Sequence, residues 1–377
     1  MRVSKRIAVF SLRLFIGIGL VICAACRNAD PLPARGRPVA GVKVYETGRE
    51  LPGLFREWRD LGINTVFASV SLNRNPEFRA LARRNGIVRY AIVPVFFDPE
   101  ALSADSSLFA VTARGEKARE EWVEFVCPSR EDFRRQKIEA FKNLIRECDP
   151  DGLSIDFIRH FVFWEKVYPE RAEGSLPNTC FDEHCLRSFE KDTGIRIPAG
   201  LKRPKEIAGW IMTTHLEKWR AWKCDLITGF VKNAADEARR TKPAILINVH
   251  AVPWRREDFS NAVQVVAGQN FADISKYCDF LSPMTYAHMV KREPSWVHSV
   301  VEDLAGQAAC PVLPSIQVGK AYLETELTTE EFAESLREAL RPPSRGVVFW
   351  SWDALEKEPS KKAIIQNLLK GKKMGSR

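Results

Sequence analysis

The sequence lacks several patterns by which common protein classes are recognised. It has no low-complexity tract, which restricts any disorder to the ends of the chain, and no basic run with interleaved aromatic residues, which argues against a nucleic-acid partner. It also has no H-x-H pair or similarly tight ligand spacing among its six histidines, so a catalytic metal is not expected. What is present is a chain of 377 residues, 45% hydrophobic and 28% charged, which is the composition of a globular protein.

The two ends of the chain differ from this composition. Basic residues followed by an apolar stretch that Arg13 interrupts are typical of a bacterial export signal, and the small residues before Cys26 resemble the lipobox of lipoproteins, although Cys23 stands where leucine is usual. We expect residues 1–26 to be a signal peptide of lipoprotein type, with lipidation at Cys26, and residues 27–37 to be a tether. Soluble secretion and an uncleaved anchor are the alternatives. Residues 372–377 read as a basic tail.

These ends also account for much of the charge. The formal charge is +9, but removal of residues 1–26 leaves +5, which is a weak bias. This weak bias does not indicate a nucleic-acid partner. From the signal we expect an exported protein in the periplasm or on the outer surface, anchored by lipid to a bacterial membrane.

Strand-like and helix-like runs alternate from residue 38 to residue 371, the expected domain. Eight strands are expected at 41–48, 63–71, 87–97, 152–158, 244–252, 278–286, 310–319 and 345–353. Helices are expected at 51–62, 75–86, 131–148, 180–195, 215–241, 295–308, 328–340 and 360–370. Eight alternating units predict an α/β fold, the (β/α)8 TIM barrel, with long loop insertions after strands 3 and 4. A doubly wound open sheet is the alternative, but no glycine-rich phosphate turn follows the first strand.

Seven cysteines follow Cys26, an odd number that leaves at least one thiol free. Cys180 and Cys185 lie close together in the run CFDEHC, where they can form a disulfide, remain free, or join His184 in a small metal site. Because the spacing is not a standard zinc pattern, we expect a disulfide or free thiols.

Reactive groups in such barrels lie at the C-terminal ends of the strands. Asp156 interrupts the apolar fourth strand and shares a face with Ser154, since side chains alternate along a strand. A buried ionised carboxylate is costly, so Asp156 must face an open cleft or be paired, and Arg159 and His160 are the nearest partners in sequence. The residue is therefore either a site residue or half of a structural Asp–Arg pair at the rim.

Two runs carry a resemblance to a known group. DGLSIDFIRH, from Asp151 to His160, resembles the fourth-strand motif DG-x-x-x-D-F/Y-I-R of the glycosyl hydrolase-like 10 group, which comprises hypothetical glycoside hydrolase barrels. DFLSPMTY, from Asp279 to Tyr286, resembles that group's sixth-strand motif D-x-L/V-x-P-M-x-Y, and GVVFWSWD is similar to the aromatic last strand of many sugar-cleaving barrels. The resemblance covers about residues 38–369 and implies a TIM barrel that cleaves glycosidic bonds without a cofactor.

Two other clans are similar only in part. A chitinase-like fourth strand has an acidic residue two positions after the first aspartate, where this chain has Ile158. An α-amylase-like fifth strand ends in glutamate, where this chain has Asn248 and His250. Neither mechanism is carried over.

Glycoside hydrolysis needs two carboxyl groups across the scissile bond. Asp156 fills one role, with Arg159 to orient it. Glu165 is the first choice for the other, because the apolar residues before it, Phe163 and Trp164, can raise its pKa and make it an acid; Glu165 can equally be a solvated residue at a helix start. Asp353 and Glu46 follow as candidates.

The expected substrate-binding residues are aromatic and polar side chains at strand ends, since sugar rings stack on aromatic rings and their hydroxyls need fixed partners. They are Tyr45, Glu46, His160, Trp164, Asn248, His250, Tyr286, Gln317, Trp350, Trp352 and Asp353. Trp350 and Trp352 can instead plug the barrel, and His250 can be structural. A non-catalytic carbohydrate-binding barrel and a metal-dependent deacetylase or hydrolase are the functional alternatives.

Overall fold

The computed structural model describes residues 38–172 and 174–371. The expected signal peptide, Cys26, the tether and the basic tail lie outside the described residues. Among those that are described, no helix is both long enough and apolar enough to cross a bilayer.

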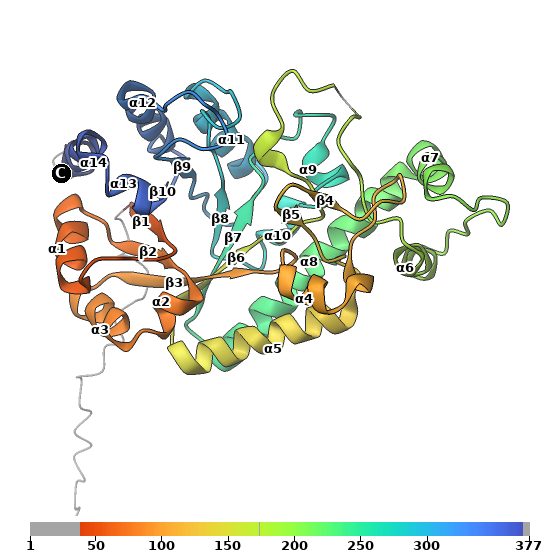
Figure 1. Cartoon of the computed structure of the whole chain (residues 1–377), viewed down its shortest axis with the longest axis horizontal. Helices are drawn as coiled ribbons and strands as arrows, with labels where there is room; N and C mark the ends of the chain where they lie inside the picture. Colours follow the sequence, from red (N-terminus) through yellow and green to blue (C-terminus); the bar gives the residue numbers. More distant parts are fainter. Residues whose placement is uncertain (1–37, 173, 372–377) are drawn as a thin grey trace, which may run out of the picture. The chain divides into compact units, whose positions relative to one another are not determined.

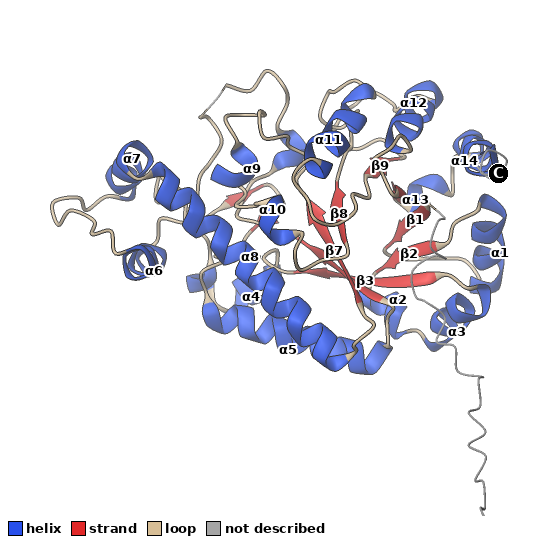
Figure 2. Ribbon diagram, turned by 180° about the vertical axis from the view of Figure 1, so that it is seen from behind, coloured by secondary structure: helices blue, strands red, loops and turns tan. Residues whose placement is uncertain are grey.

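Eight parallel strands form the centre of the fold, and all eight strands expected from the sequence are present (Figure 2). They are β1 Val39–Val44, β2 Thr65–Ala68, β3 Val88–Pro94, β6 Gly152–Asp156, β7 Leu246–Ala251, β8 Phe280–Pro283, β9 Ser315–Gln317 and β10 Gly346–Trp350. Their order is β8-β7-β6-β3-β2-β1-β10-β9. Parallel bridges from Leu281 to Val312 and from Met284 to Ser315 then join β8 to β9. The sheet therefore closes on itself, which confirms the (β/α)8 TIM barrel.

Helices surround this barrel (Figure 1). They are α1 Leu51–Leu61, α2 Val70–Arg74, α3 Pro76–Asn85, α4 Pro99–Ala104, α5 Glu131–Cys148, α6 Glu183–Thr193, α7 Pro204–Thr214, α8 Leu216–Thr241, α9 Ala262–Val265, α10 Phe271–Ile274, α11 Ser295–Ala305, α12 Thr329–Ala339, α13 Trp352–Leu355 and α14 Pro359–Gly371. The eight expected helices are confirmed with small shifts of their ends. The short helices were not expected, because a single turn of helix has too few residues to display a periodic pattern. Helix α7, with 11 residues inside the long insertion after the fourth strand, was not expected either.

Local signals explain where the main helices begin and end. Helix α1 has a proline in its first turn and ends at Gly62, whose φ of 83° is the left-handed conformation that glycine adopts without steric cost. Helix α12 begins with a capping box in which Thr328 and Glu331 bond each other's backbone N–H groups.

Two long excursions leave the C-terminal side of the barrel, as expected after the third and fourth strands. The first, residues 95–130, follows β3 and contains α4 and a two-stranded hairpin of β4 Arg119–Glu120 and β5 Val123–Glu124. The second, residues 157–215, follows β6 and contains a short 3-10 helix at Trp164–Lys166, α6 and α7. The excursions contact each other through backbone hydrogen bonds, from Phe181 N to Val111 O and from Ala113 N to Asn178 O.

The interior of the barrel changes character along its axis. Near the N-terminal ends of the strands it is apolar, a separate core cluster formed by Val39, Phe67, Tyr90, Ile92, Leu246, Phe280, Leu313 and Val348. The rings of Phe67 and Tyr90 stack there at 4.7 Å. A Cβ on Gly152 would lie 2.3 Å from the Tyr90 ring, so only glycine leaves room for it. Toward the C-terminal ends the interior becomes polar, and the candidate site lies there.

Candidate active site

Strand β6 presents Asp156 at the C-terminal mouth of the barrel. Its neighbours Leu153 and Ile155 are fully buried in the outer core, whereas Ser154 faces the interior, as the alternation of side chains predicts. Asp156 Oδ1 accepts a hydrogen bond from Phe157 N at 2.7 Å. Phe157 has a φ of 49°, a conformation that costs free energy for a bulky residue and that is often found at functional sites.

A buried polar network lies directly beneath this carboxylate. Lys43 Nζ contacts His250 Nδ1 at 3.2 Å and donates to the hydroxyl of Tyr286 at 3.1 Å. His250 Nε2 lies 2.8 Å from Ser154 Oγ, and His250 Nδ1 lies 4.0 Å from Asp156 Oδ2. Asn248 extends the network by donating to Ser154 Oγ.

The network fixes the protonation of His250. An ammonium group has only donors, so Nδ1 of His250 accepts from Lys43 and Nε2 carries the proton that it donates to Ser154. Burial lowers the pKa of His250 to about 3, so the ring is neutral at neutral pH. His250 therefore positions its neighbours and does not exchange protons near pH 7.

The charges at the mouth favour an ionised Asp156. Burial alone would raise its pKa, but the positive charges of Lys43 and Arg159 and the N–H of Phe157 together hold the pKa of Asp156 below its ordinary value. Burial lowers the pKa of Lys43 to about 8 despite the opposing effect of Asp156, so Lys43 remains mostly charged at pH 7. The pair is thus a carboxylate and an ammonium ion.

Glu165 lies in the same region but in a different environment. It is buried in the 3-10 helix that follows β6, and burial raises the pKa of Glu165 to about 7, although the nearby Arg159 opposes this. Its Oε2 and Nε1 of the adjacent Trp164 are buried without a hydrogen-bond partner. Buried polar atoms are rarely left unpaired, so Glu165 Oε2 and Trp164 Nε1 are suited to bond a hydroxyl group.

Arg159 interacts electrostatically with both carboxyl groups, those of Asp156 and Glu165. It is fully buried, donates to the carbonyl of Val162 at 2.8 Å, and packs over the ring of Phe125 at 4.6 Å. No ion pair within 4.0 Å joins Arg159 to Asp156 among the described residues, so the alternative of a structural Asp–Arg pair at the rim is not supported. Arg159 instead supplies positive charge between the two acids.

Aromatic side chains surround this pair. Tyr286 stacks on Trp350 at 4.5 Å and lies 5.8 Å from the ring of Trp164. The charges of Asp156 and Glu165 both act on the Tyr286 hydroxyl, and burial, the largest cause, raises its pKa well above the ordinary value. These three aromatic residues, all expected from the sequence, are brought together.

The large hydrophobic side chains that stay exposed in the described part of the chain are Tyr45, Trp122 and Tyr322, at 38%, 44% and 38%. All three belong to this face of the barrel. Trp122 Nε1 donates to the Tyr322 hydroxyl at 3.0 Å, Tyr322 feels the charge of Glu165, and Tyr45 feels that of Asp156. Exposed aromatic rings beside buried acids are the surface that a sugar chain needs.

Some expected site residues lie elsewhere. Trp352 starts α13 and packs edge-on against Trp58 of α1 at 5.7 Å, because the chain has already left the strand. His160 is buried beside Lys223 O, and both amide atoms of Gln317 bond backbone groups, at Met289 N and Gly319 O. Each of these three residues has a structural partner, and its part in substrate binding stays a prediction.

The two remaining carboxyl candidates are exposed. Glu46 follows β1, and Asp353 accepts a hydrogen bond from Ser351 and acts on Tyr45 through its charge. Neither has the buried surroundings that raise the pKa of Glu165. They fit contacts to substrate hydroxyl groups rather than proton transfer.

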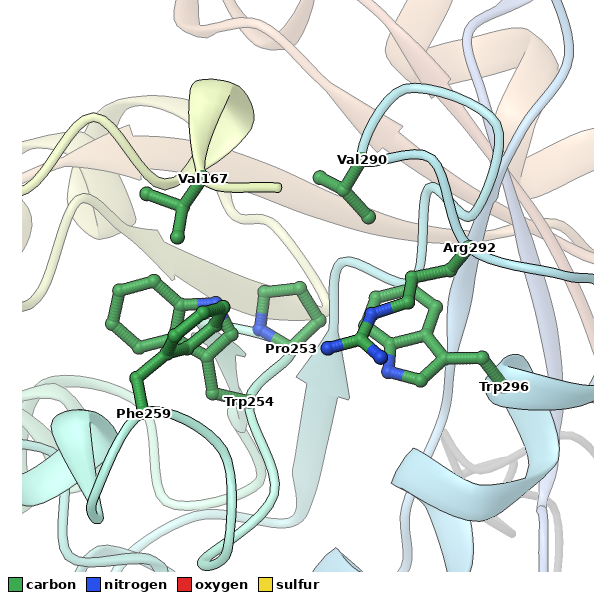
Figure 3. Close-up of a pocket in the computed structure, with 7 residues that line it drawn as sticks. All are labelled: Val167, Pro253, Trp254, Phe259, Val290, Arg292 and Trp296. Carbon is green, nitrogen blue, oxygen red and sulfur yellow. The ribbon is translucent and has the colours of Figure 1, made fainter. Parts of the chain in front are cut away.

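A small hollow lies beside the site, next to Trp254 (Figure 3). Trp254 and Phe259 form one wall and Arg292 and Trp296 the other, with Val167 above them. Trp254 follows β7, and its ring is buried and packs against Phe259 at 5.5 Å.

Three residues of the site were given no role on the basis of the sequence. Lys43 was noticeable as a lysine inside the apolar run VAGVKV, a signal comparable to that of Asp156. Trp122 and Tyr322 lie in loops 200 residues apart, and no local pattern connects them.

The fold is similar to those of solved glycoside hydrolases. The glycoside hydrolase domain of PgaB (BpsB) from Bordetella bronchiseptica is 14% identical, with a TM-score of 0.65, over 87% of this chain and 98% of that domain. The β-galactosidase from the psychrophilic Marinomonas ef1 is 11% identical, with a TM-score of 0.62 over 88% of this chain. The α-L-fucosidase isoenzyme 2 from Paenibacillus thiaminolyticus is 12% identical, with a TM-score of 0.55 over 89% of this chain.

This chain spans 98% of the PgaB domain, but 59% of the β-galactosidase and 49% of the fucosidase. No protein-family model and no curated protein matches the sequence. At these identities the likeness shows the TIM-barrel fold.

Proposed function

We propose that the protein is a glycoside hydrolase that cleaves a polysaccharide or glycoconjugate at the C-terminal mouth of its barrel. The observation that carries the proposal is a pair of buried carboxyl groups with opposite pKa shifts, Asp156 downward and Glu165 upward. Two acids whose surroundings separate their pKa values are the arrangement that divides acid and base roles between them.

In this mechanism Glu165 enters the reaction protonated. Its pKa of about 7 keeps a proton available near neutral pH, and Glu165 gives that proton to the oxygen of the leaving sugar. Asp156 enters as a carboxylate, held by Lys43 and the N–H of Phe157, and attacks the anomeric carbon or activates a water molecule. Arg159 supports the negative charge that develops as Glu165 loses its proton.

The exposed aromatic rings bind the sugar chain. Tyr45 on one side and the bonded pair of Trp122 and Tyr322 on the other offer flat apolar surfaces, while Asp353 and Glu46 accept hydrogen bonds from hydroxyl groups. The same rings favour the second candidate, a carbohydrate-binding barrel that has lost hydrolysis.

A metal-dependent deacetylase has less support. In the described part of the chain, the one group of three or more metal-binding side chains is a cysteine cluster away from Asp156. His250 approaches Asp156 to 4.0 Å, but its two ring nitrogens contact Lys43 and Ser154. His160 faces the carbonyl of Lys223, and His288 bonds the carbonyl of Thr325, so three histidines do not converge on Asp156.

The proposal includes export and a lipid anchor at Cys26, which rest on the N-terminal sequence alone. Metabolic labelling with a radioactive fatty acid tests the anchor: a Cys26→Ala variant loses the label if the proposal is right.

The catalytic proposal is tested on a panel of polysaccharides together with chromogenic β-galactosides and α-L-fucosides, the glycosides named for two structural neighbours. New reducing ends are expected with the wild type and not with Asp156→Asn or Glu165→Gln. The exposed positions Asp105→Asn and Glu170→Gln are matched controls that keep full activity. Equal rates in all five proteins would refute the assignment. Binding of a glycan by both site variants and the wild type, without cleavage by any, would favour the binding barrel.

A further inference from the structure

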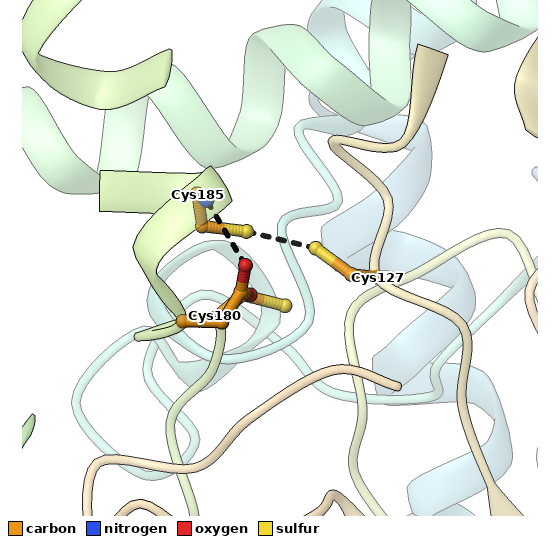
Figure 4. Close-up of side chains that lie close together, drawn as sticks. Cys127, Cys180 and Cys185 are labelled. Carbon is orange, nitrogen blue, oxygen red and sulfur yellow. Dashed lines mark hydrogen bonds between the residues drawn. The ribbon is translucent and has the colours of Figure 1, made fainter. Parts of the chain in front are cut away.

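Four potential metal ligands converge where the two excursions meet, and Figure 4 shows the three that are cysteines. They are the sulfur atoms of Cys127, Cys180 and Cys185 and a carboxylate oxygen of Asp182, and all four lie within 4.8 Å of one another. All three cysteines are completely buried. The first comes from the excursion after β3, and the other three residues come from the excursion after β6.

The sequence placed two of these cysteines together and suggested His184 as a third ligand. The structure replaces His184 with Cys127 from the other excursion, because His184 Nε2 turns toward the carbonyl of Ser129 at 3.3 Å. The resulting pattern is Cys-x-Asp-x-x-Cys with a distant cysteine, which no local spacing rule describes.

The number of converging groups, rather than the sulfur–sulfur distance, favours a shared cation over a disulfide. Cys127 Sγ and Cys185 Sγ are 2.8 Å apart. This separation lies between the bonded distance of about 2.05 Å and the separation of about 3.8 Å between sulfur atoms around a tetrahedral zinc ion, whose Zn–S bonds are about 2.3 Å long. A disulfide would also use only two of the four groups and leave a buried thiol and a carboxylate beside it.

Asp182 provides an independent indication that a cation binds at this cluster. Its Oδ1 caps α6 by accepting from Cys185 N at 3.1 Å and also accepts from Arg130 at 3.3 Å. Its Oδ2 is buried and has no hydrogen-bond partner. A buried carboxylate oxygen without a partner is costly, and a cation would satisfy it.

The surroundings suit a site that carries negative charge. Lys223 is fully buried and its charge interacts with all three cysteines, while its Nζ donates to Asn178 Oδ1 and to two backbone carbonyls. Thiolates are the form of cysteine that binds metals, and a nearby ammonium group favours that form.

We propose that Cys127, Cys180, Asp182 and Cys185 bind one structural divalent transition-metal ion of borderline softness, with zinc the best fit. Three thiolates and one carboxylate make a closed four-ligand set, which leaves no open position for catalysis. Binding displaces the three thiol protons to solvent. The ion fastens the excursion that carries Trp122 to the excursion that carries Glu165, and so it stabilises the candidate active site without touching substrate.

The experiment measures metal in the full chain purified without chelator, by elemental mass spectrometry. About one zinc per chain is expected in the wild type and in the control Cys148→Ser, which changes a buried thiol at the end of α5. Cys127→Ser and Cys180→Ser are expected to lose the zinc. Asp182→Asn keeps a residue able to cap α6 and is expected to bind zinc more weakly, which separates loss of metal from loss of the fold.

Two further measurements on the wild type keep the proposal testable if the serine variants fail to fold. Replacement of zinc by Co²⁺ is expected to give the visible absorption of tetrahedral cobalt with thiolate ligands, and a strong chelator is expected to lower the unfolding temperature. Wild-type protein without zinc that takes up neither Zn²⁺ nor Co²⁺ after reduction would overturn the proposal. An intact mass lower by two hydrogens, with a disulfide mapped among the three cysteines, would overturn it as well.

Discussion

The two ends of the barrel interior are built by the same eight strands and yet serve different purposes. At the N-terminal end the interior is filled by apolar side chains such as Phe67, Tyr90 and Phe280. At the C-terminal end the same strands place Lys43 and Asp156 in the interior, joined by hydrogen-bonded histidine, serine and asparagine. One end gains stability from apolar burial, whereas the other holds charges whose burial is costly.

The difference indicates that the C-terminal end of the barrel interior is built for chemistry at a cost in stability. Buried charged groups contribute little to stability compared with apolar packing, so the presence of Lys43 and Asp156 at the C-terminal end indicates a role in chemistry. Changes at the mouth are expected to reduce turnover more than stability, and changes at the closed end are expected to do the reverse.

The largest effect is expected from Asp156→Asn. Loss of the carboxylate removes the nucleophile or base, and kcat/KM should fall roughly 10⁴-fold while the unfolding temperature changes little. Steady-state kinetics and calorimetry on the same preparation check this. A loss smaller than tenfold would remove Asp156 from the mechanism.

Glu165→Gln is expected to follow, with kcat/KM lower by about 10³-fold, because the amide cannot give a proton to the leaving group. With a substrate whose leaving group needs no protonation, such as a nitrophenyl glycoside, Glu165→Gln should retain most of the wild-type rate. Equal losses on both kinds of substrate would contradict a role as the acid.

At the closed end, Phe280→Ala is expected to destabilise the protein by about 3–5 kcal/mol, because it opens a cavity in the apolar cluster. Urea unfolding measures the change. The folded fraction should keep its kcat/KM within about twofold, and a selective loss of activity at unchanged stability would end the distinction between the two ends.

The pH dependence separates the two acids. Glu165 must be protonated, so kcat/KM should fall about tenfold per unit as pH rises above its pKa of about 7, or roughly 100-fold by pH 9. Asp156 must be ionised, and since its pKa lies below the ordinary value, activity should persist into mildly acidic solution. A profile that rises from pH 7 to 9 would reverse the assigned roles.

The smallest effects are expected from the exposed rings. Trp122→Ala or Tyr322→Ala should raise KM about tenfold, the equivalent of about 1.4 kcal/mol of stacking, and leave kcat almost unchanged. Trp352→Ala is the matched control: its ring packs on Trp58, so the unfolding temperature should fall while KM stays constant. A rise in KM for Trp352→Ala, with no rise for Trp122→Ala or Tyr322→Ala, would mean that Trp352 contacts the substrate and the two exposed rings do not.

The barrel and much of its mouth were predictable from the sequence. Period-two and helical patterns depend on local burial, so all eight strands were found, and Asp156 was identified as a carboxylate inside an apolar strand. Glu165 was chosen for its apolar neighbours, and the structure does bury it.

The errors have physical causes as well. Trp352 was assigned to the last strand, but the chain turns into α13 at Trp352 and carries the ring outward. Gln317 and His160 were expected at the mouth because they are polar residues near the ends of strands. In the structure, their side chains form hydrogen bonds with backbone groups. A sequence gives the residue type at each position, but it does not give the group with which that side chain forms a hydrogen bond.

By itself, the sequence determined the alternating strands and helices and the strand that bears Asp156, because these follow from side-chain periodicity along a short stretch of chain. Only the tertiary structure decided which residues meet: Lys43 with Asp156, Trp122 with Tyr322, and Cys127 with Cys185. Barrel closure and the contact between the two excursions bring these residues together, and such long-range contacts leave no periodic signal in the sequence.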